Sequence, residues 1–187
     1  MTKPHPPIVL RERLRYQGYK YTFLGQRLKF PNQTEGDREY IVHPGGAVVV
    51  PVTASGHFVC IRQYRFAVGD YIYEFPAGTL EPGEHPAYTV KRELEEETGL
   101  RGHRWDDLGT FYLAPGYSDE VMYAYLARDL EVLSERPPGD EDEDIAVVEL
   151  TAAELQEKVR LSPELDAKSI ACFYRALLFL EQEQSST

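Results

Sequence analysis

Cysteine, long apolar runs and clustered positive charge are all scarce in this chain, and each scarcity excludes a class of protein. The two cysteines, Cys60 and Cys172, stand in apolar surroundings without metal-ligand spacing, so we expect buried thiols rather than a disulfide framework or a zinc site. The longest apolar pattern, Ile170 to Leu180, is too short and too interrupted to span a bilayer. The opening residues, MTKPHPPIVL, show no cationic stretch followed by an apolar one, so we see no secretory signal and expect a cytoplasmic protein.

Acidic residues outnumber basic ones by 31 to 20, which gives a formal net charge of −11. Without a run of Lys or Arg, neither a nucleic-acid backbone nor an anionic membrane is an expected partner. A protein this acidic would bind phosphate groups through a metal ion and a few well-placed arginines. Its 187 residues and 42% hydrophobic content suit one well-filled globular core.

The most informative stretch is GTLEPGEHPAYTVKRELEEETGL, which runs from Gly78 to Leu100. Residues 81–84 (Glu-Pro-Gly-Glu) are typical of a β-turn, with Pro fixing φ at the second position and Gly free to take positive φ at the third. Pro86 suits the first helical turn, and Gly99 suits the left-handed position that ends a helix. We therefore predict a helix over residues 86–98.

The predicted helix carries acids beside its apolar face. At roughly 100° per residue, Glu93 and Glu97 fall on the same side as the apolar stripe, Glu96 lies just beyond them, and Arg92 can pair with Glu96 one turn away. The stripe consists of Ala87, Val90 and Leu94. A solvated acidic face is the ordinary interpretation of such a helix, but carboxylates crowded beside a core repel one another unless a cation neutralises them. We therefore expect a site for magnesium, a hard ion that takes carboxylate oxygens.

The same residues resemble the Nudix box. The pattern is Gly78, five residues, Glu84, seven residues, then Arg-Glu-Leu-x-Glu-Glu-x-Gly-Leu over residues 92–100, with all nine specified positions present. The resemblance implies an α/β/α sandwich around a mixed sheet. It also implies an enzyme that uses Mg²⁺, with Mn²⁺ as the alternative, to hydrolyse nucleoside diphosphates linked to another group. By resemblance the residues that carry the chemistry are Arg92, Glu93, Glu96 and Glu97, and the metal ligands are Glu93, Glu97 and the carbonyl of Ala77.

The acidic segment 140–144 is a second candidate. Such a run is usually solvated, but this one leads directly into an apolar strand, and the box offers metal ligands from one side only. Bacterial ADP-ribose pyrophosphatases have a loop of similar pattern, and by position Glu141 would be the general base and Glu143 a further metal ligand. The assignment could slip by one residue because every neighbour is acidic. Glu120 remains an alternative base.

Residues outside these acids suggest the branch of the family. Pro115 follows the box by fifteen residues and forms a Pro-Gly turn with Gly116, as in the ADP-ribose pyrophosphatase branch, and the nearby Glu120 could contact the ligand. By resemblance Arg65 would grip the diphosphate, although a solvent-facing or salt-bridged role fits it equally well, and Arg38 is a weaker candidate. His43 and His57 are expected at the surface or in turns.

The first 45 residues are expected to form a unit before the catalytic domain, which covers residues 46–187. Residues 1–15 show little periodicity, and we expect a mobile or partner-packed arm there, followed by two strands, within 19–30 and 38–42. A sheet this small is not stable alone, so we expect it to pack on the main domain or to build a homodimer. Its aromatic residues Tyr21 or Phe23 could stack on adenine.

In the main domain the apolar run 47–52 predicts a strand buried on both faces, forming a hairpin with 57–65. Further strands are expected at 71–75, 105–113, 121–127 and 145–150. Thr151 and Glu154 form a capping-box pattern that opens a helix through Val159. A last helix would begin at 162–164, with an apolar face made of Ile170, Phe173, Tyr174, Leu177, Leu178 and Leu180.

Together these features predict hydrolysis of ADP-ribose to AMP and ribose 5-phosphate. GDP-mannose or another nucleoside diphosphate sugar is an alternative substrate. A module that binds a nucleotide without catalysis is a hypothesis from another class, and the intact box argues against it because a pure binder does not need every catalytic acid.

Overall fold

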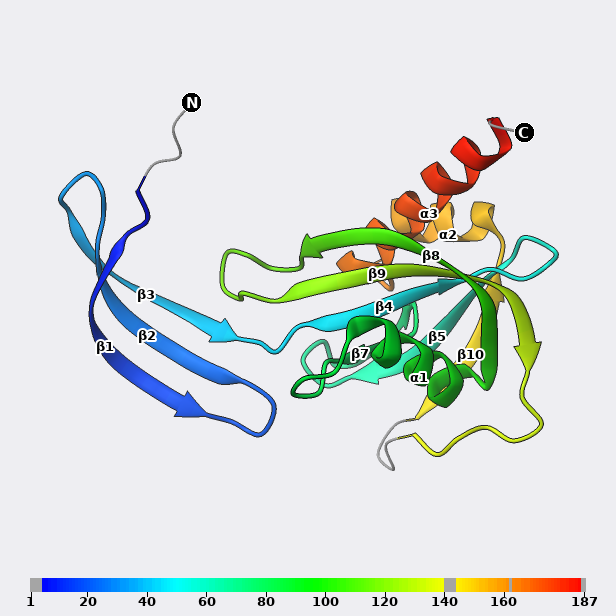
Figure 1. Cartoon of the computed structure of the whole chain (residues 1–187), viewed down its shortest axis with the longest axis horizontal. Helices are drawn as coiled ribbons and strands as arrows, with labels where there is room; N and C mark the ends of the chain where they lie inside the picture. The colour runs from blue at the N-terminus through cyan, green and yellow to red at the C-terminus, as the bar shows by residue number, and fades with distance from the viewer. Residues whose placement is uncertain (1–4, 140–143, 162, 186–187) are drawn as a thin grey trace. The chain divides into compact units, whose positions relative to one another are not determined.

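A computed structural model describes residues 5–139, 144–161 and 163–185. The predicted acids Glu141 and Glu143 therefore lie outside the described residues. In chain order the elements are β1 (Ile8–Gln17), β2 (Thr22–Lys29), β3 (Glu35–Val42), β4 (Gly46–Pro51), β5 (Phe58–Arg65), β6 (Asp70–Glu74), β7 (Ala77–Thr79), α1 (Pro86–Thr98), β8 (Leu100–Tyr112), β9 (Val121–Val132), β10 (Ile145–Leu150), α2 (Ala152–Leu161) and α3 (Ala167–Ser185) (Figure 1). No helix within these ranges is long and apolar enough to cross a membrane.

The chain folds as two compact units. The first comprises the chain up to Pro44 together with Tyr112–Val121, and the second comprises Gly45–Phe111 and the chain from Met122 onward. In the first unit, β1, β2 and β3 form an antiparallel sheet in that order, so both strands expected there are confirmed. The segment after β8 joins this unit, since the Ile41 N–H donates to the Tyr117 carbonyl at 2.8 Å.

The expectation of a mobile or partner-packed arm over residues 1–15 did not anticipate a strand there. Residues from Ile8 onward form β1, which pairs with β2 along its whole length and is exposed at every position. The pairing contains register shifts between Val9 and Arg11 and between Glu12 and Leu14. Each irregularity breaks the two-residue alternation that reveals a strand in a sequence.

The second unit contains two sheets. One is antiparallel in the order β10-β5-β6, and the other is mixed in the order β7-β4-β9-β8, with β4 parallel to β9 and antiparallel to β7. The predicted hairpin of β4 with β5 was wrong, because the two strands belong to different sheets, and the turn between them is closed by a single bridge of Val52 with Phe58. All six residues of β4 are buried, as its apolar run predicted, and a strand buried on both faces is placed at the centre of a sheet.

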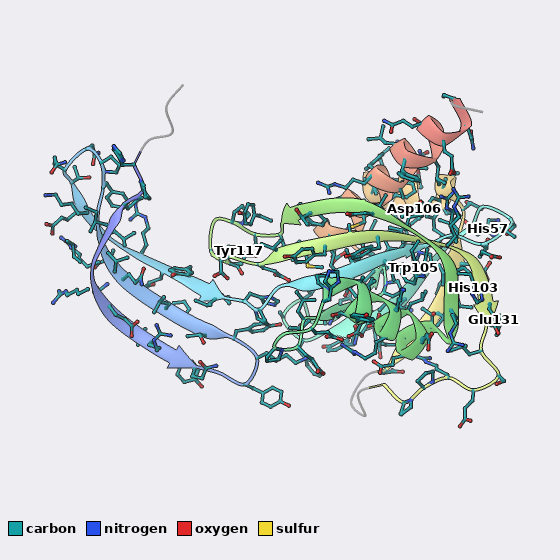
Figure 2. All side chains as sticks on the ribbon, viewed as in Figure 1. His57, His103, Trp105, Asp106, Tyr117 and Glu131 are labelled. Atoms are coloured by element: carbon teal, nitrogen blue, oxygen red, sulfur yellow. The ribbon has the colours of Figure 1, made fainter. Side chains whose placement is uncertain are left out.

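Helices α1 and α3 both pack on β4, which gives the α/β/α arrangement that was expected (Figure 1). The apolar stripe of α1 contributes Val90 and Leu94 to a buried cluster with Ala47, Val49 and Ala127 from the mixed sheet. Across β8 and β9, His103 and Glu131 pair on the exposed edge at 2.9 Å (Figure 2).

Helix α3 begins at Ala167, three to five residues later than predicted. The carboxylate of Asp166 accepts the Ser169 N–H at 3.0 Å and so caps the helix there. Its buried face also differs from the expected stripe, because Tyr174 and Leu178 are exposed. The residues that α3 buries are Lys168, Ser169, Cys172, Phe173 and Ala176. Both cysteines are buried as expected, and burial raises the pKa of each thiol to about 12.

Candidate active site

The turn and helix of the box form as the sequence predicted. The Glu84 N–H donates to the Glu81 carbonyl at 2.9 Å, and Gly83 takes a φ of 81°. His85 is the N-cap of α1, where its Nδ1 accepts the Ala87 N–H at 3.2 Å. Gly99 ends the helix in the left-handed conformation, at a φ of 71°. The box therefore presents its acids from a helix with defined ends.

Three carboxylates of the box surround one arginine. Arg92 Nη1 lies 2.8 Å from Glu93 Oε1 and 2.9 Å from Glu96 Oε2, and Arg92 Nε lies 3.6 Å from Glu84 Oε1. Partial burial opposes the charged form of Arg92, but Glu93, Glu96 and Glu84 together raise its pKa. One positive charge faces three negative ones, so the cluster retains an excess of negative charge.

The fourth acid of α1, Glu97, contacts β7, the strand that precedes the turn. Its side chain is almost fully buried, at 3% exposure, and its Oε2 accepts the Ala77 N–H of β7 at 2.9 Å. Gly78 follows directly, and a Cβ there would lie 1.8 Å from Glu93 Oε1. The Glu93 carboxylate can occupy this position only because residue 78 has no side chain. The three predicted metal ligands, Ala77, Glu93 and Glu97, are thus gathered at one place.

This donor set fits a hard divalent cation. Carboxylate and backbone carbonyl oxygens are the ligands that Mg²⁺ takes, and the ion would neutralise the excess negative charge around Arg92. Within the described residues, no three acidic, histidine or cysteine side chains are already arranged as a metal-binding group. Glu143 was predicted to supply a further carboxylate and lies outside the described residues.

The sequence left open whether Arg65, at the end of β5, is salt-bridged, and in the structure it pairs with an acid. Its Nε and Nη2 both contact the carboxylate of Glu74, with Nη2 at 2.8 Å from Oε2. Glu97 is among the acids that raise the pKa of Arg65, so this arginine lies within electrostatic range of the box. Sequence reasoning missed Glu74 and its second partner Lys168. The available signal was a single acid at the end of an apolar strand.

The remaining candidates lie in the first unit. The residues around Pro115 and Gly116 form a turn in which the N–H groups of residues 117 and 118 donate to the Ala114 carbonyl. Glu120 lies 3.7 Å from His43 Nε2. Arg38 stacks over the Phe30 ring at 4.8 Å and donates to a backbone carbonyl, so its described contacts are structural.

His43 differs from the expectation of a surface or turn residue. Its side chain is only 6% exposed, and its ring stacks on Tyr21 at 4.8 Å. One face of the Tyr21 ring, which was expected to be available to adenine, is therefore covered by an imidazole. His57 is exposed, as expected.

Comparison with known proteins agrees with this geometry. The NUDIX domain model matches residues 42–171. An ADP-ribose pyrophosphatase of Bacillus subtilis is 39% identical over 142 residues, which cover 76% of this chain and 77% of the relative. A GDP-mannose pyrophosphatase of Cronobacter sakazakii is 32% identical over 133 residues, covering 67% and 69%.

A solved structure described as an ADP compounds hydrolase shares the fold. It superimposes with a TM-score of 0.85 over 98% of both chains, at 24% sequence identity. With an intact box on a capped helix and a domain match over most of its length, this chain belongs to the Nudix family of hydrolases.

Proposed function

We propose that this protein hydrolyses the diphosphate bond of ADP-ribose with magnesium, giving AMP and ribose 5-phosphate. The observation that carries the proposal is the convergence of Glu93 and Glu97 on the Ala77-Gly78 backbone, beside an arginine outnumbered by carboxylates. The names of the Bacillus subtilis relative and of other relatives support this substrate.

The residues divide the work of the reaction. Bound magnesium would neutralise diphosphate oxygens and stabilise the charge that grows on phosphorus. Glu93, Glu97 and the Ala77 carbonyl hold the ion, with Glu143 as a further ligand. Arg92 keeps the Glu93 and Glu96 carboxylates in place through its 2.8 Å and 2.9 Å contacts.

The general base in this proposal is Glu141. A box carboxylate that binds metal is a much weaker base, because the cation stabilises its ionised form, so in this proposal the base comes from outside α1. Glu141 removes the proton from the attacking water as a new oxygen–phosphorus bond forms and the bridging oxygen–phosphorus bond of the diphosphate breaks, which releases AMP and ribose 5-phosphate. Glu141 and Glu143 are two apart, so on an extended segment they share a side.

Glutamine substitutions test this assignment. Glu141→Gln should lower kcat by about 10²–10⁴, as expected for loss of a general base, and leave metal affinity nearly intact. Glu143→Gln should mainly weaken metal binding. Near-wild-type kcat in Glu141→Gln, combined with a collapse in Glu120→Gln, would move the base to the other loop.

A substrate panel tests the substrate itself. Turnover of ADP-ribose, GDP-mannose and other nucleoside diphosphate sugars would be followed by phosphate release after phosphatase treatment, with Mg²⁺ or Mn²⁺ present. We expect kcat/KM to be highest for ADP-ribose. Comparable values for GDP-mannose would contradict the substrate assignment, and no turnover of any compound would favour the binding-module hypothesis.

We also propose a homodimer built through the first 45 residues, in a protein of the cytoplasm. Strand β1 exposes apolar side chains along its length, including Ile8 at 64% and Tyr16 at 66%. A three-stranded sheet with such a surface gains stability by covering it. Light scattering should give twice the chain mass of 21.4 kDa, and a monomer would contradict the proposal. The two buried free thiols suit a reducing compartment.

A further inference from the structure

A second group of charged side chains lies at the end of β6, a strand that precedes the box. Glu74 is the last residue of β6 and is 1% exposed, and its carboxylate accepts hydrogen bonds from Arg65 and Lys168. Lys168, 8% exposed in the first turn of α3, also pairs with Asp166. We refer to Arg65, Glu74, Asp166 and Lys168 as the buried ion group. Its two acids and two bases neutralise one another.

Glu74 acts as a fixed negative charge in this group. Burial by itself would raise the pKa of the Glu74 carboxyl, but Lys168 and Arg65 together lower the pKa to about 2. The carboxylate is therefore ionised under all conditions near neutrality. An ionised buried carboxylate with two cationic partners sets the direction of both partners.

The contact with Glu74 fixes the plane of the Arg65 guanidinium. Nε and Nη2 both donate to the carboxylate, a two-point geometry that only the arginine fork can make. Glu74 uses this edge alone and leaves the edge with Nη1 for another anion. The Arg65 side chain remains 39% exposed, so an anion arriving from solvent can reach it.

The buried ion group is not needed simply to attach β6 to α3. Other hydrogen bonds already join these segments: the Phe75 N–H, directly after β6, donates to Ser169 Oγ of α3 at 2.8 Å, and the Tyr73 N–H of β6 donates to the Glu164 carbonyl, three residues before α3, at 2.6 Å. What the ions add is orientation of one partly exposed arginine that lies within electrostatic range of Glu97 of the box.

We propose that Glu74 and Lys168 are positioning residues, which hold Arg65 in the orientation that grips the diphosphate of the substrate. This inference rests on the proposed function, because it assigns Arg65 to the diphosphate of the same substrate. Glu74 orients the guanidinium, and Lys168 compensates the charge of Glu74 so that the carboxylate can stay ionised while buried.

A double-mutant cycle tests whether Glu74 acts through Arg65. Arg65→Ala should raise the KM for ADP-ribose by about tenfold and change kcat less, and Glu74→Gln should raise it several-fold. Because both remove the same contact, the double variant should match Arg65→Ala within about twofold. If the factors by which the two single substitutions raise KM multiply in the double variant, the proposal is overturned. An unchanged KM in a Glu74→Gln protein that is only less stable would also overturn it.

Two control variants are available in the same fold. Arg62 lies on the same strand as Arg65 but one residue out of phase, and it stacks over Tyr71 and Tyr73, so Arg62→Ala should leave KM unchanged. Glu183 also joins two cations, Arg104 and Arg128, so Glu183→Gln should leave KM unchanged as well. A rise in KM in either control equal to that of Glu74→Gln would overturn the specific role of the buried ion group.

Arg65→Lys keeps the test decisive if Glu74→Gln does not fold. Lysine retains the positive charge but cannot hold Glu74 and a phosphate with two separate edges. We expect a rise in KM close to that of Arg65→Ala. A wild-type KM would show that a point charge is enough and would overturn the proposal.

Binding of inorganic pyrophosphate separates this inference from the proposed function. Calorimetric titration with magnesium present requires no turnover of ADP-ribose. Weaker binding by a similar factor in Arg65→Ala and Glu74→Gln would support the positioning role even if ADP-ribose proved not to be a substrate. Absence of binding to the wild type, or equal binding by wild type and Glu74→Gln, would overturn it.

Discussion

Two arginine clusters of the second unit, the one around Arg92 and the buried ion group, differ in charge balance. Around Arg92, one guanidinium faces the carboxylates of Glu84, Glu93 and Glu96. In the buried ion group, two acids face two bases. Both clusters hold an arginine beside a glutamate, so the presence of an ion pair does not distinguish them. The number of unmatched charges does.

This difference in charge balance indicates that the Arg92 cluster requires a bound cation, whereas the buried ion group does not. An excess of carboxylates is repulsive until a cation arrives, so the Arg92 cluster gains when magnesium binds. A balanced group in a buried place has little to gain from an added ion and instead fixes geometry. The burial of the glutamates follows the same division, since the side chains of Glu84, Glu93 and Glu96 are 19%, 13% and 23% exposed and that of Glu74 is 2% exposed.

The largest expected effect comes from removing the charge of a predicted metal ligand of the box. Glu97→Gln should keep the fold and lower kcat by two or more orders of magnitude, because a metal ligand is lost. Glu95→Gln is the matched control, since Glu95 lies on the same helix but pairs with Arg101 at 2.6 Å. Steady-state kinetics over a range of Mg²⁺ concentrations measure both. Equal losses in the two variants would show that general helix charge, rather than a metal site, is responsible.

A smaller loss of activity is expected when a methyl group is added against the Glu93 carboxylate and no charge is changed. A Cβ at residue 78 would lie 1.8 Å from Glu93 Oε1, so Gly78→Ala should displace that carboxylate. The displaced atom is the end of a flexible side chain, and the fold should survive. We expect activity or metal affinity to fall by about 10–100-fold, as when the setting of a metal ligand is disturbed.

Magnesium titration with circular dichroism as the folding check measures this variant. Wild-type magnesium affinity and kcat in folded Gly78→Ala would mean that the position of Glu93 over the Gly78 backbone does not matter for metal binding.

Features with local signals were predictable from the sequence. Pro86 and Gly99 set both ends of α1 correctly, because each residue restricts or permits a backbone conformation by itself. The capping box at Thr151 formed as expected, with the Glu154 N–H donating to Thr151 Oγ1 and the Thr151 N–H to Glu154 Oε2. Strand β10 has the predicted bounds.

Features that depend on distant partners were not predictable in this way. The start of α3 is not one of them, because its cap is local: the Asp166 carboxylate accepts the N–H of Ser169, three residues later, and the sequence analysis missed this signal. Glu74 and Lys168 are 94 residues apart, and nothing in either local sequence points to the other. The assignments of Glu141 and Glu143 stay predictions, since both lie outside the described residues.

The smallest effect we predict is a loss of stability when Glu74 of the buried ion group is replaced. The dependence of this loss on pH identifies its cause. The pKa of Glu74 is lowered to about 2 from an ordinary value of 4.5, chiefly because Lys168 and Arg65 outweigh the opposing effect of burial. A depressed folded-state pKa contributes stability above the unfolded value, and that stability is lost as the pH falls toward the folded value. Glu74→Gln should therefore reduce the free energy of unfolding at pH 7 by about 1.5 kcal/mol, the lower end expected for a charged hydrogen bond because glutamine keeps an oxygen acceptor. Urea denaturation from pH 7 to pH 2 should show this deficit constant down to about pH 5 and narrowing between pH 4.5 and 2.

Glu149→Gln, at an exposed residue of β10, should change the free energy of unfolding by no more than about 0.5 kcal/mol. A deficit in Glu74→Gln that stays constant down to pH 2 would mean that lost packing, rather than a lost charge, causes it, and the balanced group would then not be held together by ions.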